Sequence, residues 1–66
     1  MTLAYIHLTL ADERKRKQIE QKEIAKALGL DPSTISLYEK GKRGIPLKIL
    51  DKWLYLLDLE VELIFK

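Results

Sequence analysis

Lysine and arginine are the residues of this chain whose grouping could do chemistry. Seven of the twelve lie in two clusters, "RKRK" at residues 14–17 and "KGKR" at residues 40–43, and the acidic residues are scattered among the predicted helices. The formal net charge is only +2. Clusters of this kind can bind the phosphates of a polyanion, but taken alone each is more simply interpreted as a solvated helix face. The charge pattern therefore permits a polyanionic partner without requiring one.

The sequence lacks the residues that catalytic and metal-binding sites usually need. The 66 residues include no cysteine and one histidine, which excludes a disulfide framework, a thiolate metal site and a histidine cluster. Spacing assembles no nucleophile, base and orienting group, and "EKGKRG" lacks the strand and the spacing of a nucleotide-binding loop. We therefore expect a protein that is not an enzyme and that uses no cofactor and no metal.

No segment suggests export or a membrane. A membrane-spanning helix needs about 20 apolar residues, and no apolar run approaches that length. Nothing resembles a signal peptide. An intracellular, cytoplasmic protein is the expectation.

The first predicted element could be a helix or a strand. Thr9 and Asp12 form a weak capping box, which would start a helix near Leu10. The preceding "LAYIHLTL" alternates well enough for a short strand, although the helix could also begin earlier and use Ile6 as an anchor. No strong helix breaker lies between Leu10 and Leu28, so one continuous helix over that range is an alternative.

Two short helices with well-marked ends follow. "QKEIAKAL" at residues 21–28 has one narrow apolar face, and Gly29 supplies a left-handed C-terminal position. Asp31 is a good N-cap and Pro32 suits the first position of a third helix over residues 32–40, with Ile35 and Tyr38 pointing inward. Helices joined by about three residues with a glycine predict a helix-turn-helix unit at about 21–40. A generic small bundle would be joined in much the same way.

The fourth predicted helix, residues 46–57, is apolar around most of its circumference. A stripe for the core is expected from Leu47, Leu50, Leu54 and Leu57. That leaves Trp53 with two interpretations, a core residue or an anchor for a partner protein.

The last residues change period. "LEVELIFK" alternates apolar and acidic residues, which predicts a C-terminal β-strand at about 59–65. Such a strand must pair, either with the N-terminal segment or with a second copy across a two-fold axis, unless the end is frayed. The predicted dimer or partner interface consists of Trp53, Val61, Leu63 and Phe65.

The stretch "EIAKALGLDPSTISLYEKGKR" resembles the helix-turn-helix of the phage repressor and Cro family, the Cro/C1 or xenobiotic-response-element type. The resemblance covers roughly Leu10 to Leu59. Its pattern consists of Gln21, Ala25, Gly29, "STIS" at residues 33–36, Glu39 and "GKR" at residues 41–43. Small members of this family that act as antitoxins often end in a strand after the fourth helix, and this tail resembles theirs.

The resemblance implies a mainly α, compact four-helix domain whose third helix inserts into the major groove of double-stranded DNA. It places three side chains at base edges: Ser33, Ser36 and Leu37. It implies phosphate contacts by Thr34, Lys40, Lys42 and Arg43. Gln21 would contact phosphate or brace the third helix, and Arg14 would pair with Glu39.

The chain departs from the family pattern in four respects. Pro32 stands where many relatives carry a long polar base-reading side chain, and the reading face has no glutamine or asparagine, with Lys40 as its only basic residue. Gln18 replaces the usual glycine between the first two helices, and Glu20 is a poorer cap than serine or threonine. Few side chains are therefore expected to contact base edges directly.

Two functions follow from these observations. The first is a sequence-specific DNA-binding repressor that acts as a homodimer on an inverted repeat. The second is an antitoxin-type module that neutralises a partner protein through its apolar fourth helix or tail, with DNA binding secondary or lost. The thin reading face favours the second function, and the basic "GKRG" loop favours the first.

Overall fold

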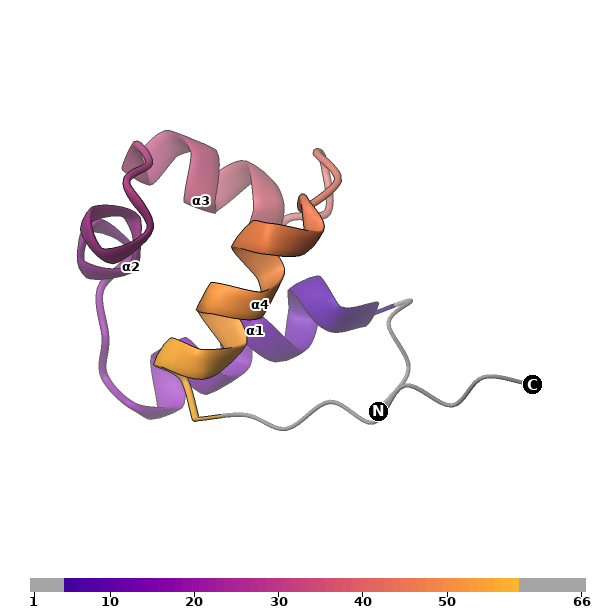
Figure 1. The fold of residues 1–66 in the computed structure, drawn as a ribbon. Helices are drawn as coiled ribbons and strands as arrows, with labels where there is room; N and C mark the ends of the chain where they lie inside the picture. The colour runs from indigo at the N-terminus through magenta and orange to yellow at the C-terminus, as the bar shows by residue number, and fades with distance from the viewer. Residues whose placement is uncertain (1–4, 59–66) are drawn as a thin grey trace.

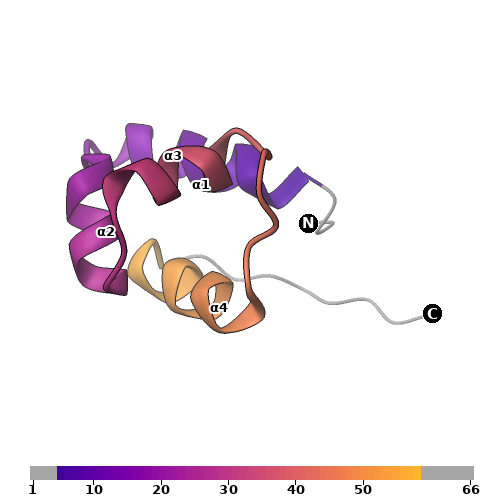
Figure 2. The same ribbon diagram turned by 90° about the horizontal axis from the view of Figure 1, so that it is seen from above.

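The computed structural model describes residues 5–58, and four helices make up most of that range (Figure 1). They are α1 (Ile6–Arg16), α2 (Gln21–Leu28), α3 (Pro32–Glu39) and α4 (Leu47–Leu56). α3 packs against α2 and α1, and α4 packs against α2. From above, α1 and α3 lie on one side, α4 lies on the other, and α2 closes one end (Figure 2). The expected mainly helical, four-helix domain is confirmed.

No strand occurs within residues 5–58. The predicted strand at 59–65 lies outside the described residues, and so do three residues of the predicted interface, Val61, Leu63 and Phe65.

One apolar cluster at the centre of the domain holds the helices together. Its largest fully buried side chains are Trp53, Leu10, Ile35 and Leu57, so α1, α3 and α4 all contribute. Tyr38 and Trp53 pack with ring centroids 6.4 Å apart and a tilt of 54°, an arrangement that aromatic pairs favour. The inward orientation predicted for Ile35 and Tyr38 is confirmed.

α1 begins at Ile6, four residues before the start suggested by Thr9 and Asp12, so the capping-box prediction is wrong. Ile6, Leu10 and Arg14 are spaced at i, i+4 and i+8 and are all buried. A helix over these residues places all three on the face that packs against the rest of the domain. Burial of that face, rather than a cap, sets the start of α1.

The break between α1 and α2 falls at Gln18, so the two helices are separate. Gln18 adopts a left-handed conformation with φ of 58°. Its N–H donates to the carbonyl of Lys15, and the next N–H, of Ile19, donates to the carbonyl of Arg14, both at 3.0 Å. This pair of hydrogen bonds is the Schellman ending of a helix, which usually uses glycine.

α4 differs from the predicted core stripe at its first residue. Leu50 and Leu57 are buried as expected, but Leu47 is 75% exposed. Trp53 is fully buried in its place, because Leu50, Trp53 and Leu57 follow the helical spacing i, i+3 and i+7. The prediction for Leu47 is therefore wrong, and the core interpretation of Trp53 is the correct one.

Candidate nucleic-acid interface

The turn between α2 and α3 sets the direction of α3. Gly29 ends α2 with φ of 71°, as expected, and the N–H of Leu30 donates to the carbonyl of Ala25 at 2.8 Å. Asp31 occupies the N-cap position of α3 with an extended backbone, but its carboxylate makes no capping hydrogen bond. The N–H of Thr34 donates to the Asp31 carbonyl instead, at 3.0 Å. The position predicted for Asp31 is confirmed, whereas capping by its side chain is not observed.

A buried ion pair fixes the far end of α3 to α1. Arg14 Nε donates to Glu39 Oε2 at 2.7 Å, and Arg14 Nη2 donates to Glu39 Oε1 at 3.1 Å. Arg14 Nη1 donates to the carbonyl of Ile19 at 2.8 Å, which ties the pair to the α1–α2 turn. The pair implied by the family resemblance is confirmed. A bidentate, buried pair of this kind fixes geometry more than it adds stability.

Gln21, the first residue of α2, joins the same network. Its side-chain Nε2 donates to Glu39 Oε1 at 2.9 Å. Of the two roles that the resemblance allowed, the structure gives Gln21 the one of bracing α3. The bracing bond links α2 to the C-terminal end of α3, so three helices meet at the Glu39 carboxylate.

The residues expected to touch bases lie on α3 with different exposure. Ser33 is exposed near the N-terminus of α3, while Ser36 and Leu37 are half-buried further along it. Thr34, a predicted phosphate contact, is also half-buried. Ser33 is therefore the predicted base-reading residue with the freest side chain.

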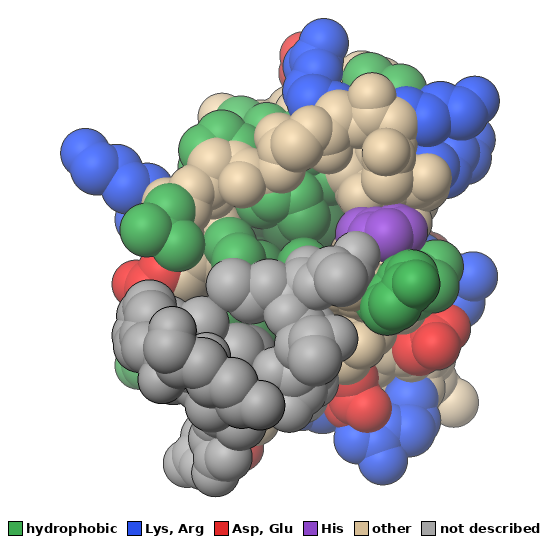
Figure 3. Space-filling view, turned by 90° about the vertical axis from the view of Figure 1, so that its right-hand side faces the viewer, with side chains coloured by type: hydrophobic (Ala, Val, Ile, Leu, Met, Phe, Trp, Pro, Cys, Tyr) green, Lys and Arg blue, Asp and Glu red, His purple; other side chains and the backbone are tan. Residues whose placement is uncertain are grey.

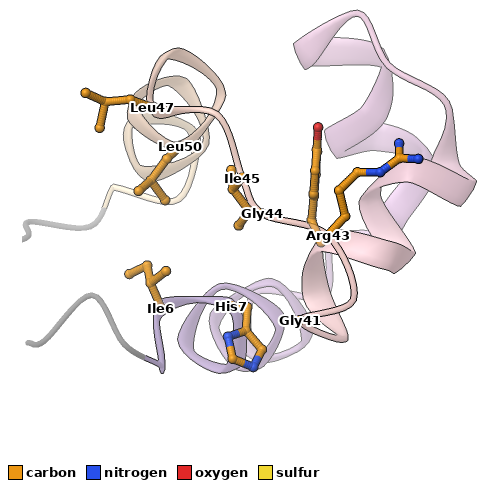
Figure 4. A pocket seen from close by; sticks show the side chains of 9 residues that line it. Ile6, His7, Gly41, Arg43, Gly44, Ile45, Leu47 and Leu50 are labelled. Carbon is orange, nitrogen blue, oxygen red and sulfur yellow. The ribbon is translucent and has the colours of Figure 1, made fainter.

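The loop after α3 carries the second basic cluster. Lys40, Lys42 and Arg43 are all exposed. Gly41 adopts φ of 71°, and the N–H of Lys42 donates to the Leu37 carbonyl at 3.0 Å, so the loop continues directly from the end of α3. Figure 4 shows the Arg43 guanidinium turned away from the leucines of α4.

The first basic cluster does not act as one unit. Arg14 is buried in the ion pair, whereas Arg16 pairs with Glu13 of the same helix and Lys17 donates to the carbonyl of Leu57. Lys15 is exposed and lies with Ser36 and Lys40 around one cavity. The sequence pattern missed Lys15 as a site residue, although its place within the cluster was a signal.

A largely apolar surface adjoins the basic loop, whose residues Gly41 and Arg43 also line its groove. A groove of about 480 Å³ opens between the first residues of α1 and α4, lined by Ile6, Ile45, Leu47 and Leu50 (Figure 4). Apolar side chains are recessed on this face, with the histidine at the edge of the hollow (Figure 3). Trp53 is fully buried and reaches no surface, so its assignment to a partner interface is wrong.

A comparison of the sequence with protein-family models agrees with the helix-turn-helix geometry of α2, the turn and α3. Residues 10–64 match the family model described as Helix-turn-helix, of the Cro/C1 type. The chain belongs to the Cro/C1-type helix-turn-helix family. No curated protein and no solved structure matches it. This is a family of DNA-binding regulatory domains rather than of enzymes, so DNA is the partner and transcription regulation is the kind of function.

Other classes of site are not found in the described part of the chain. Residues 5–58 contain no group of three or more histidine, cysteine or acidic residues that could hold a metal ion. None of the helices within that range is long and apolar enough to cross a membrane.

Proposed function

We propose that this protein is a sequence-specific transcriptional repressor that binds an inverted repeat as a homodimer and works in the cytoplasm. The observation that carries the proposal is the bracing of α3. Arg14 and Gln21 hold Glu39 from two other helices, so α3 is presented as a rigid rod with Ser33 exposed near its N-terminus. A rigid, protruding helix of this kind suits insertion into the major groove.

Base recognition would rest on few side chains. Ser33 and Ser36 can exchange hydrogen bonds with several bases, and Leu37 can contact a thymine methyl group. Thr34, Lys40, Lys42 and Arg43 would hold the DNA backbone and fix the orientation of the domain, while Gln21 braces α3. Because α3 carries no arginine, asparagine or glutamine, selectivity would depend partly on DNA shape and on the use of two half-sites.

Dimerisation would supply the second half-site. We assign it to the alternating apolar residues of the C-terminal segment, Val61, Leu63 and Phe65, paired with the same segment of a second copy. Two α3 helices would then face successive turns of the same groove.

In vitro selection from a random duplex library at near-physiological salt tests this function. The expected result is an inverted repeat with half-sites about one helical turn apart. Only salt-sensitive bulk binding, with no enriched motif, would overturn the proposal of sequence-specific repression.

A second candidate is an antitoxin-type module that binds a partner protein. The observation in its favour is the exposure of large apolar side chains on α4, where Tyr55 is 85% exposed and Leu56 and Leu47 are also exposed. Tyrosine is a frequent anchor in protein interfaces. Co-purification of the tagged chain with the protein encoded by the adjacent gene tests it, and Tyr55→Asp is expected to abolish that association. Co-purification that Tyr55→Asp does not affect would remove α4 as the partner surface.

A further inference from the structure

A cavity of about 350 Å³ lies where α1, α2 and α3 meet, beside the face of α3 that would enter DNA. α1 is the element that no DNA-binding prediction included. Four of the lining residues are used in the inference: Asp12, Lys15, Ser36 and Lys40.

The floor of the cavity is closed to a ligand. Arg14 and Glu39 line it, and both are already committed: Arg14 to two carboxylate oxygens and the Ile19 carbonyl, Glu39 to Arg14 and Gln21. Their charges cancel locally, so the buried pair contributes little net attraction for an anion.

The walls carry donors that remain available. Lys15 comes from α1, Ser36 from α3, and Lys40 is the residue that follows the last turn of α3, where its N–H donates to the Ser36 carbonyl. Within residues 5–58, none of these three side chains makes a hydrogen bond or an ion pair. Both lysines are exposed, so their ammonium groups can turn toward a ligand without breaking an existing contact.

We infer that this cavity seats one phosphate of the DNA backbone between Lys15 and Lys40, and that the Ser36 hydroxyl donates its hydrogen bond to this phosphate rather than to a base. The inference rests on the proposed function, since α3 must lie in the groove for a backbone strand to pass over the seam of α1 and α3. Lys15 is the new contact. Asp12 lines the same cavity and is exposed, so its carboxylate opposes the phosphate and sets the affinity lower than the two lysines alone would.

Salt-dependent binding to the selected duplex tests the role of Lys15. Each phosphate contact contributes about 0.9 to the slope of log K against log salt, or about a threefold change in affinity between 50 and 200 mM. Lys15→Ala is expected to reduce the slope by about one and to leave the preferred bases unchanged. Lys52→Ala is the matched control, because Lys52 is an exposed lysine on α4, on the other side of the domain (Figure 2).

Neutralising Asp12 should change the DNA affinity in the opposite direction. Asp12→Asn is expected to tighten DNA binding several-fold at low salt, and Asp51→Asn, an equally exposed position on α4, is expected to have little effect. Equal effects of Lys15→Ala and Lys52→Ala, in a wild type that binds its motif, would overturn the phosphate site alone. A wild type that selects no motif would overturn the proposed function and this inference together.

A neutral phosphate in the DNA locates the contact. A methylphosphonate is placed at each backbone position of the half-site in turn, and binding is compared for wild type and Lys15→Ala. One position is expected to weaken wild-type binding clearly more than it weakens the variant, which keeps only Lys40 and Ser36 at that phosphate. If the loss of affinity from Lys15→Ala adds to the loss from the methylphosphonate at every position, Lys15 contacts no single phosphate.

Discussion

Four residues of the described chain have positive φ, and each ends a helix. Gly29 and Gly41 follow α2 and α3, while Gln18 and Asp58 follow α1 and α4. Glycine adopts this conformation without strain, whereas any other residue in it destabilises the folded state by about 1–2 kcal/mol. Only the end at Gly29 was predicted as left-handed. Glutamine and aspartate give no such signal in a sequence, and Gly41 was considered only as part of the basic cluster.

Gln18→Gly is expected to stabilise the domain by about 1 kcal/mol, since relief of the left-handed strain exceeds the added entropy of the unfolded chain. For a domain of this size, the melting temperature would rise by about 4–8 °C. Urea unfolding monitored by circular dichroism measures the change. Gln18→Ala keeps the strained conformation and is the control that should give no gain. A less stable Gln18→Gly variant would contradict the argument.

Gly41 has a second constraint that Gly29 lacks. A Cβ at Gly41 would lie 2.9 Å from Nε2 of His7, whereas a Cβ at Gly29 would meet nothing within 4 Å. Gly29→Ala is expected to cost about 1 kcal/mol from its backbone alone, and Gly41→Ala more. In a His7→Ala background the cost of Gly41→Ala should fall to that of Gly29→Ala. The same cost in both backgrounds would mean that His7 moves aside freely.

At the scale of elements, α3 depends on contacts made by two other helices. The Glu39 carboxylate is the point where α1, α2 and α3 are joined. Periodicity could predict where each of these helices lies, but not how α3 is oriented. The orientation comes from side chains 18 and 25 residues away from Glu39.

Glu39→Gln is expected to lower the free energy of unfolding by about 3–5 kcal/mol, because Arg14 would remain buried without a counter-charge. A domain of 66 residues has little more stability than that, so the variant should be largely unfolded. Glu20→Gln removes an exposed pair with Lys22 and should cost less than about 1 kcal/mol. Similar melting temperatures for the two variants would contradict the role of the buried pair.

Substitutions near the N-terminus of α3 and in the loop after α3 should affect DNA binding differently. Ser33→Ala is expected to relax preference at one or two base positions, because Ser33 is exposed at the reading end. Arg43→Ala is expected to weaken binding to all sequences and to reduce the salt slope by about one. Competition between specific and random duplexes at several salt concentrations separates the two effects. Unchanged selectivity in Ser33→Ala would move the reading face elsewhere.

At the scale of the whole molecule, the proposed reading face offers one copy few base contacts, so the proposed function relies on two copies. Leu63→Glu is expected to dissociate the proposed dimer and to abolish binding to the inverted repeat. Ile64→Glu introduces the same charge on the other side of the alternation and should leave the dimer intact. Sedimentation velocity measures both. A Leu63→Glu protein that stays dimeric would rule out assembly through this segment.

The sequence alone determined the features that are local. Helix ends marked by Gly29 and Pro32, the apolar face of α2, and the family pattern from Gln21 to Arg43 all depend on neighbouring residues, and each could be predicted. The predicted reading face also follows from that pattern, and its contacts with DNA remain predictions.

Only the tertiary structure decided what depends on packing. Distant helices set the early start of α1 and the burial of Trp53 in place of Leu47. They also set the division of "RKRK" into one buried arginine and three exposed basic residues. A side chain such as Arg14 or Lys15 carries the same charge in either environment. Its role follows from whether Glu39 or an open cavity lies opposite it, and residues adjacent in the sequence do not specify that.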